Sequence, residues 1–246
     1  MPQWIVDRFV AAYGEKKAEE IFKAFHSKST ISIRTNLTRC TPDELRAMLE
    51  AEGVTVTAVD ELNYAFVISG FDYLNGLQSF RDGLFYVQDI SSMLVAQTAA
   101  PKKGNYVIDV CAAPGGKSTH IAELLQGSGH VLARDLTDNK VDMIEENIER
   151  HGLNNMSAEV WDATVPDADS AGKADILICD LPCSGLGVLG RKKDIRYKMT
   201  PESVDELAAL QRQILDTVHT YVKPNGVLVY LSLIHISEPT RRTPIS

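Results

Sequence analysis

The segment Cys111-Ala-Ala-Pro-Gly-Gly-Lys-Ser-Thr119 has the residue types of a loop that holds a nucleotide or a nucleoside. It follows an apolar run and precedes a helical pattern, and its Gly-Lys-Ser end is typical of a phosphate-binding P-loop. A P-loop also requires a glycine five residues before Gly116, and this chain has Cys111 there. Pro114 has no N–H with which to bind a phosphate. The segment therefore does not meet the requirements of a P-loop, and other residues must decide its ligand.

Acidic and thiol side chains follow the predicted strands. Asp135 lies 19 residues beyond Gly116, Asp162 follows the next strand, and Cys179-Asp180-Leu-Pro-Cys183-Ser184 ends another. The carboxyl ends of parallel strands meet at one edge of a sheet, where doubly wound proteins bind ligands. Carboxylates repel phosphates but suit ribose hydroxyls and a positive centre, which predicts S-adenosylmethionine as the ligand. A single such acid is more often a cap or a surface residue, so the prediction rests on the ordered set.

The periodicity of the chain predicts helices at residues 1–28, a small α+β domain at 29–90 and an α/β core at 91–230. The α+β domain is expected to hold strands near 30–35, 54–59 and 64–68 and a helix at 42–52. In the core the order becomes strand, helix, strand, which predicts a parallel sheet with crossover helices. Its expected strands lie at 106–110, 130–133, 157–161, 176–180 and 226–230, and its helices at 117–126, 138–151 and 201–221.

The composition indicates a globular protein. The 246 residues are 44% hydrophobic and 24% charged, and no apolar run approaches the roughly 18 residues of a membrane helix. The N-terminus lacks the features of a signal peptide, so we expect a cytoplasmic location and no membrane partner. The four cysteines form no zinc-binding pattern, so no metal site is expected. A net charge of −8 argues against indiscriminate nucleic-acid binding but allows a local basic face.

Two of these segments, 109–119 and 180–187, resemble motifs of the Nol1/Nop2/Sun family of RNA cytosine-C5 methyltransferases. Ser32-Ile-Arg-Thr-Asn36 and Tyr86-Val-Gln-Asp-Ile-Ser-Ser-Met93 also resemble family segments, so the likeness covers about residues 2–230. Within the family the likeness is to the 16S rRNA enzymes. The resemblance implies a class I (Rossmann-like) methyltransferase core, with a doubly wound sheet, preceded by a small RNA-recognition-like α+β domain.

The resemblance also implies which residues contact S-adenosylmethionine. By motif they are Cys111, Ala112, Ala113, Pro114, Gly115, Gly116, Lys117, Asp135, Asp162 and Asp180. Cytosine C5 is a poor nucleophile, so in such enzymes a thiolate first adds to C6 and thereby activates C5. Asp180 is the candidate carboxyl group beside cytosine N3, and Cys183 is the candidate catalytic thiol. Cys111 lies in the cofactor loop, where we expect it to pack rather than to attack.

The sequence departs from the family after the strand expected at 226–230. The family's nucleophile is the cysteine of a Thr-Cys pair at the end of the fifth strand, while the Pro-Cys thiol, here Cys183, assists product release. This chain contains no Thr-Cys pair. Residues 231–246 resemble translated vector or adapter sequence instead of the last strands of the sheet. We therefore expect a sheet without its last strands and no transfer by the family mechanism.

Two alternatives to an RNA methyltransferase stay open. The chain could act as a non-catalytic module that binds S-adenosylmethionine and RNA. It could also act as a DNA-type cytosine methyltransferase, whose nucleophile is the Pro-Cys thiol, here Cys183. The position of the attacking thiol distinguishes these functions.

A cluster of cations beside the Pro-Cys motif predicts an RNA contact. The stretch Arg191-Lys-Lys-Asp-Ile-Arg-Tyr-Lys198 contains five cations and one acid. A charged loop is usually a solvated surface, but here it follows the motif where a target base would enter. The candidate RNA-binding residues are Arg191, Lys192, Lys193, Arg196 and Lys198. We expect small-subunit rRNA as the partner and a monomeric protein.

Overall fold

The structure is a computed structural model that describes residues 1–26, 30–190 and 192–232. The chain forms two compact units. One, here called the sheet unit, comprises residues 30–181 and 213–231. The other, called the helical unit, comprises the described parts of residues 1–29, 182–212 and 232–246. Each unit is considered by itself.

The first part of the sheet unit is a four-stranded antiparallel sheet in the order β2-β3-β1-β4. Thr41 caps helix α3, because its side chain accepts a hydrogen bond from the Glu44 amide while Glu44 binds the Thr41 amide in return. Apolar side chains of β1, β3, β4 and α3 form a buried core. In chain order the elements are β1 (Ile31–Thr35), α3 (Pro42–Ala51), β2 (Thr55–Val59), β3 (Leu62–Ser69), η1 (Leu74–Gly76), α4 (Gln78–Arg81) and β4 (Phe85–Val87).

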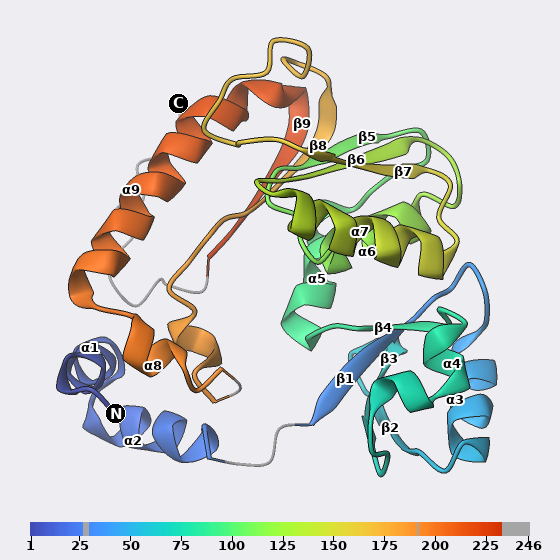
Figure 1. The fold of residues 1–246 in the computed structure, drawn as a ribbon, viewed down its shortest axis with the longest axis horizontal. Helices are drawn as coiled ribbons and strands as arrows, with labels where there is room; N and C mark the ends of the chain where they lie inside the picture. The colour runs from blue at the N-terminus through green and yellow to red at the C-terminus, as the bar shows by residue number, and fades with distance from the viewer. Residues whose placement is uncertain (27–29, 191, 233–246) are drawn as a thin grey trace. The chain divides into compact units, whose positions relative to one another are not determined.

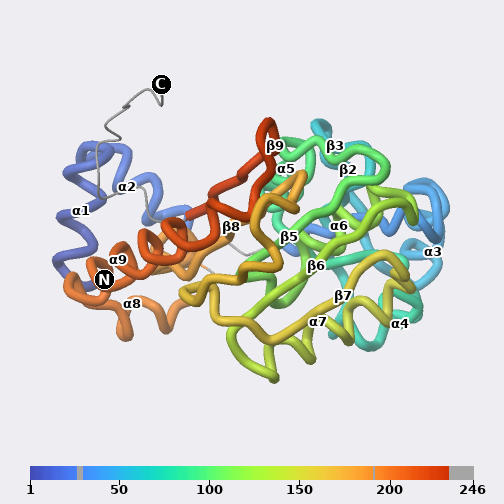
Figure 2. Tube along the Cα trace, turned by 90° about the horizontal axis from the view of Figure 1, so that it is seen from above, coloured from blue at the N-terminus to red at the C-terminus, as the bar shows by residue number. Residues whose placement is uncertain are grey.

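The second part is a five-stranded parallel sheet in the order β7-β6-β5-β8-β9, which Figure 2 shows side by side. Helices α5, α6 and α7 lie along one face (Figure 1) and contribute to its apolar core. The strand order reverses direction at β5, which creates a crevice at the carboxyl ends of the strands. The elements are α5 (Ile90–Ala99), β5 (Tyr106–Asp109), α6 (Gly116–Leu124), β6 (His130–Asp135), α7 (Asp138–His151), β7 (Met156–Val160), β8 (Ala174–Asp180), η3 (His219–Tyr221) and β9 (Val222–Leu231).

The helical unit packs around a small apolar cluster. Ile5, Phe9 and Ala18 from the N-terminal helices contact Leu186 and Leu189 in this cluster. Its elements are α1 (Gln3–Tyr13), α2 (Glu15–Ala24), η2 (Leu186–Val188), α8 (Ile195–Lys198) and, as far as Arg212, helix α9 (Pro201–Val218). None of the helices in the described ranges is both long and apolar enough to cross a membrane.

The predicted α/β class, with a parallel sheet preceded by an α+β domain, is confirmed. The sequence patterns located the five core strands and their helices, but they missed β4 and helix α5, whose even distribution of apolar residues hides the helical period. In the described part of the chain β9 is an edge strand that pairs only with β8. The proposed domain boundaries at residues 28/29, 90/91 and 230/231 stay predictions, and most of the predicted foreign tail lies outside the described residues.

Candidate functional site

The loop between β5 and α6 is folded back on itself by backbone hydrogen bonds. The Gly115 amide donates to the Ala112 carbonyl (2.7 Å), and the Ala112 amide donates to the Arg134 carbonyl of β6 (2.9 Å). Gly115 has a φ of 99°, a backbone conformation that side chains with a Cβ rarely adopt. The glycine therefore allows the chain to turn directly from the strand into the helix.

Asp135, at the carboxyl end of β6, binds this loop. Its carboxylate accepts from the Ala113 amide (2.9 Å), from the Leu136 amide (2.8 Å) and from Lys140 Nζ (2.8 Å). The side chain is 5% exposed, while that of Lys140 is 50% exposed. A carboxylate can accept about four hydrogen bonds, so one more acceptor position remains on Asp135.

Lys117 and Asp180 form an ion pair across the edge of the sheet. Lys117 stands in the first turn of α6, and Asp180 ends β8; Lys117 Nζ lies 2.5 Å from Asp180 Oδ2. Both side chains remain partly exposed. We refer to the ends of β5, β6 and β8, at Asp109, Asp135 and Asp180, as the carboxyl edge.

Asp109 lies beneath the loop and is 1% exposed. Ser118 donates a hydrogen bond to its Oδ2 (2.5 Å), and its Oδ1 has no hydrogen-bond partner. Burial disfavours the charged carboxylate and raises the pKa of Asp109 to about 7. Near neutral pH both the protonated and the charged form of this carboxyl group are therefore populated.

Cys111 is a poor nucleophile in this structure. Burial, with Asp109 and Asp135 adding negative charge, raises the pKa of its thiol to about 12. The thiol therefore remains protonated at neutral pH. This supports a packing role for Cys111.

Asp162 stands apart from the other acids of the candidate set. It follows β7 by two residues and is exposed, and its Oδ1 accepts from the amide (2.8 Å) and the hydroxyl (2.7 Å) of Thr164. The neighbouring Trp161 amide donates to the Asp135 carbonyl (2.9 Å), which brings the backbone of this turn beside the end of β6. The structure thus joins the loop, Asp135 and Asp180 by direct contacts, and it brings Asp162 near through the backbone.

Cys183 and the predicted RNA contacts belong to the helical unit. Cys183 is a free, half-buried cysteine, and the carbonyl of the preceding Pro182 accepts from Gln211 Nε2 (2.7 Å). The approach of Cys183 to the carboxyl edge therefore stays a prediction from the sequence.

The basic cluster of the helical unit is partly neutralised. Lys198 pairs with Asp194 at 2.9 Å, whereas Lys192 and Lys193 are exposed. The guanidinium of Arg196 lies 5.7 Å from the ring centre of Tyr197, which is 81% exposed. Arg191 lies outside the described residues. An exposed aromatic ring among cations is suited to stacking on an unpaired base.

Four residues that contact the site were not singled out from the sequence. Arg34 and Tyr86 come from the antiparallel sheet, and Lys140 and Asn147 come from α7. Arg34 gave no signal of this kind, because the alternation in β1 places it with Ser32 on the face opposite Ile33, and only the fold shows that this second face is also buried. Arg34, Tyr86 and Asn147 contact loop residues that are distant from them in sequence. Lys140 contacts Asp135, which lies beyond the loop motif.

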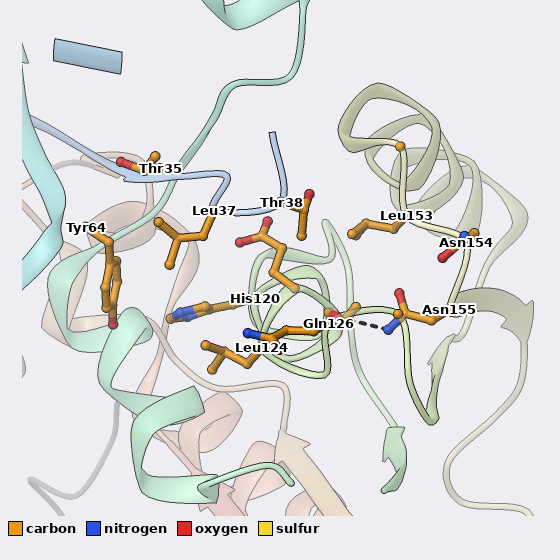
Figure 3. Close-up of a pocket in the computed structure, with 14 residues that line it drawn as sticks. Thr35, Leu37, Thr38, Tyr64, His120, Leu124, Gln126, Leu153, Asn154 and Asn155 are labelled. Atoms are coloured by element: carbon orange, nitrogen blue, oxygen red, sulfur yellow. Dashed lines mark hydrogen bonds between the residues drawn. The ribbon is translucent and has the colours of Figure 1, made fainter. Parts of the chain in front are cut away.

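A separate cavity of about 430 Å³ lies at the other end of α6. Figure 3 shows Thr35 and Tyr64 of the small sheet on one side of it, with His120 of α6 between them and Gln126. Gln126 precedes β6, and Asn154 and Asn155 precede β7, so the cavity faces the amino ends of the strands. It is therefore distinct from the carboxyl edge.

Comparison with known proteins identifies the family of this chain. Residues 96–238 match the family described as 16S rRNA methyltransferase RsmB/F, and residues 1–71 match the ferredoxin-like domain of the same group. The first match alone covers more than half of the chain. The chain belongs to the RsmB/F family of methyltransferases. This match confirms the resemblance inferred from the motifs. It also confirms the prediction that the chain belongs to a family of enzymes.

Similar proteins and solved structures extend this likeness over nearly the whole chain. The probable ribosomal RNA small subunit methyltransferase B of Bacillus subtilis (strain 168) is 38% identical over 231 residues, which are 93% of this chain and 51% of that protein. The crystal structure of PH0851 aligns with a TM-score of 0.90 at 29% identity, over 94% of this chain and 52% of that one. A methyltransferase homolog from Pyrococcus horikoshii aligns with a TM-score of 0.77 at 26% identity, over 92% and 71%. The chain spans about half the length of the curated relatives it matches.

Proposed function

We propose that this chain binds S-adenosylmethionine at the carboxyl edge and is the cofactor-binding part of an enzyme that methylates cytosine C5 in 16S rRNA. The observation that carries the proposal is the pairing of both lysines at this edge. Lys117 is held by Asp180 and Lys140 by Asp135. Neither lysine is then available for a phosphate, whereas the carboxylates still offer acceptor positions to hydroxyls and a positive centre.

The residues at the carboxyl edge fit that cofactor. Asp135 has a remaining acceptor position for ribose hydroxyls, and the loop it holds turns at Gly115, where a Cβ would lie 3.4 Å from Ile144 Cγ2 of α7. S-adenosylmethionine would supply an electrophilic methyl group there. Asp180 places one oxygen on Lys117, and we propose that the other faces cytosine N3. The Cys183 thiol is proposed to act on the cytosine ring, either as the group that attacks C6 or as the thiol that assists product release.

Calorimetry with S-adenosylmethionine tests this proposal. The whole chain is expected to bind the cofactor, and Asp135→Asn is expected to weaken binding at least tenfold, because an acceptor with a full charge is lost. Asp175→Asn is the matched control. Asp175 also accepts from a backbone amide (Tyr106, 2.7 Å) and a lysine (Lys223, 2.7 Å), but it stands at the amino end of β8. No binding by the folded chain, or equal losses in the two variants, would contradict the proposal.

The alternatives give different outcomes in a methyl-transfer assay. A non-catalytic module binds the cofactor and RNA without transferring a methyl group. A DNA-type mechanism gives transfer that Cys183→Ala abolishes, because the Pro-Cys thiol is then the nucleophile. Because no Thr-Cys pair is present, we expect no transfer by the family mechanism.

Salt dependence tests the proposed RNA contact. If Lys192 and Lys193 neutralise phosphates of single-stranded RNA, Lys192→Ala with Lys193→Ala should reduce the slope of log affinity against log salt by roughly one to two units. Lys16→Ala with Lys17→Ala is the control, since it removes the same charge from exposed positions of α2. An equal slope for the chain and the Lys192/Lys193 variant would refute the contact.

A further inference from the structure

Tyr86 reaches from β4 of the small sheet to the proposed cofactor loop. Its hydroxyl donates to the Pro114 carbonyl at 3.1 Å. Its ring also packs on Gly116, where a Cβ would lie only 3.0 Å from the Tyr86 ring. One side chain from outside the parallel sheet therefore fixes both a carbonyl of the loop and the start of α6.

The Pro114 carbonyl has a second hydrogen-bond donor, which comes from a different element. Asn147 Nδ2, from α7, lies 2.9 Å from the same oxygen. A carbonyl oxygen accepts two hydrogen bonds, so Tyr86 and Asn147 together satisfy it. The loop is thus held between the small sheet and a helix of the parallel sheet.

Arg34 of β1 binds the carbonyl of Gly116, the residue at which the loop enters α6. Its Nη1 donates to the Gly116 carbonyl (3.0 Å) and to Gln88 Oε1 (2.5 Å), and its Nη2 lies 2.9 Å from Glu123 Oε1. The side chain is 1% exposed, and its guanidinium lies 5.4 Å from the ring centre of Tyr86. Arg34 and Tyr86 therefore form one contiguous support for residues 114–116.

We propose that Tyr86 and Arg34 are positioning residues for the cofactor loop, so that the small sheet is a working part of the methyl-donor site. This inference rests on the proposed function of that loop. Its physical basis is that neither residue stands at the carboxyl edge, yet each holds a loop carbonyl in place. The loop amides and the crevice that they border are consequently oriented by the small sheet as well as by the core.

The chemistry of Tyr86 suits this role over a wide pH range. Burial raises the pKa of its hydroxyl to about 12, so the group remains a donor at all pH values at which the protein is used. Loss of that donor leaves the Pro114 carbonyl with Asn147 alone. Tyr86→Phe removes the hydroxyl and keeps the ring that packs on Gly116.

Calorimetric titration with S-adenosylmethionine, paired with urea unfolding of each variant, tests the inference. Tyr86→Phe should weaken cofactor binding about three- to tenfold, the range for one lost hydrogen bond. Tyr64→Phe is the matched control, because Tyr64 is also a buried tyrosine of the small sheet, and its hydroxyl accepts from Gln97 (3.2 Å) instead of holding the loop. Tyr64→Phe should change the urea midpoint of unfolding by about as much as Tyr86→Phe does, and it should leave the affinity for S-adenosylmethionine unchanged.

A double-mutant cycle separates positioning from a general loss of stability. Tyr86→Phe combined with Asn147→Ala removes both donors, so the loss of affinity should exceed the product of the two single losses. Tyr64→Phe combined with Asn147→Ala should give only the product. Multiplicative losses in both cycles, or an unchanged affinity in Tyr86→Phe, would overturn the positioning role while leaving the proposed function intact. Absence of binding by the unaltered folded chain would overturn both.

Discussion

Replacing Arg34 with methionine is expected to lower the free energy of unfolding by about 3–5 kcal/mol, the usual cost of breaking a buried ion pair. The reason is that Glu123, whose side chain is 2% exposed, loses the cation that pairs with it at 2.9 Å. Burial already raises the pKa of Glu123, and Arg34 is the group that opposes this. Urea unfolding of the variant and the parent chain measures the change.

Two further variants show whether the ion pair causes the loss. Arg34→Met with Glu123→Leu should recover much of the stability, because the uncompensated buried charge is gone. Lys198→Ala removes a cation from the exposed pair with Asp194 and should change stability little. If Arg34→Met alone lost less than about 1 kcal/mol, the pair would not be buried as the structure describes.

Replacing Asp109 with asparagine is expected to remove a pH-dependent loss of stability. The pKa of Asp109 is about 7 in the folded chain, raised by burial, and its ordinary value is 3.8. Between these pH values the folded chain holds a proton that the unfolded chain has released, so the stability contributed by this group falls as pH rises. Relative to the parent chain, Asp109→Asn should therefore gain roughly 2–3 kcal/mol between pH 5 and pH 8.

The free energy of unfolding of the variant must be compared with that of the parent chain at each pH. The reason is that two histidines make the parent chain more stable as pH rises, which opposes the effect of Asp109. Burial lowers the pKa of His120 to about 2 and that of His151 to about 4, so both destabilise the folded chain as pH falls below their ordinary value of 6.5. Urea unfolding at pH 5, 6, 7 and 8 gives the difference directly. Asp162→Asn serves as the control, since hydrogen bonds from Thr164 lower the pKa of Asp162 and its effect should be constant in this range. A constant difference for Asp109→Asn as well would contradict the shifted pKa.

Much of the fold followed from local patterns in the sequence. The parallel strands are short apolar runs, and capping at Thr41 is encoded within four residues, so both can be recognised without tertiary contacts. The elements that were missed lack such a signal. β4 has three residues, and the apolar side chains of α5 are spread around the helix without forming one stripe, so its helical period is weak.

The sequence by itself determined the composition of the proposed site: a loop that is not a P-loop, followed by Asp135, Asp162 and Asp180 after successive strands. Strand order then brings the loop and two of these acids to one edge, which is why their sequence order was informative. The family motifs added the expected roles of these residues.

Only the tertiary structure decided how these groups are paired and held. The ion pair of Lys117 with Asp180 joins residues 63 positions apart, and the bond from Arg34 to Gly116 joins residues 82 positions apart. Sequence periodicity shows which face of an element is buried, but a side chain's partner depends on how separate elements pack. For that reason the sequence could show that Lys117 belongs to the loop. Only the fold could show that Asp180 forms an ion pair with this lysine and that the small sheet supports the loop.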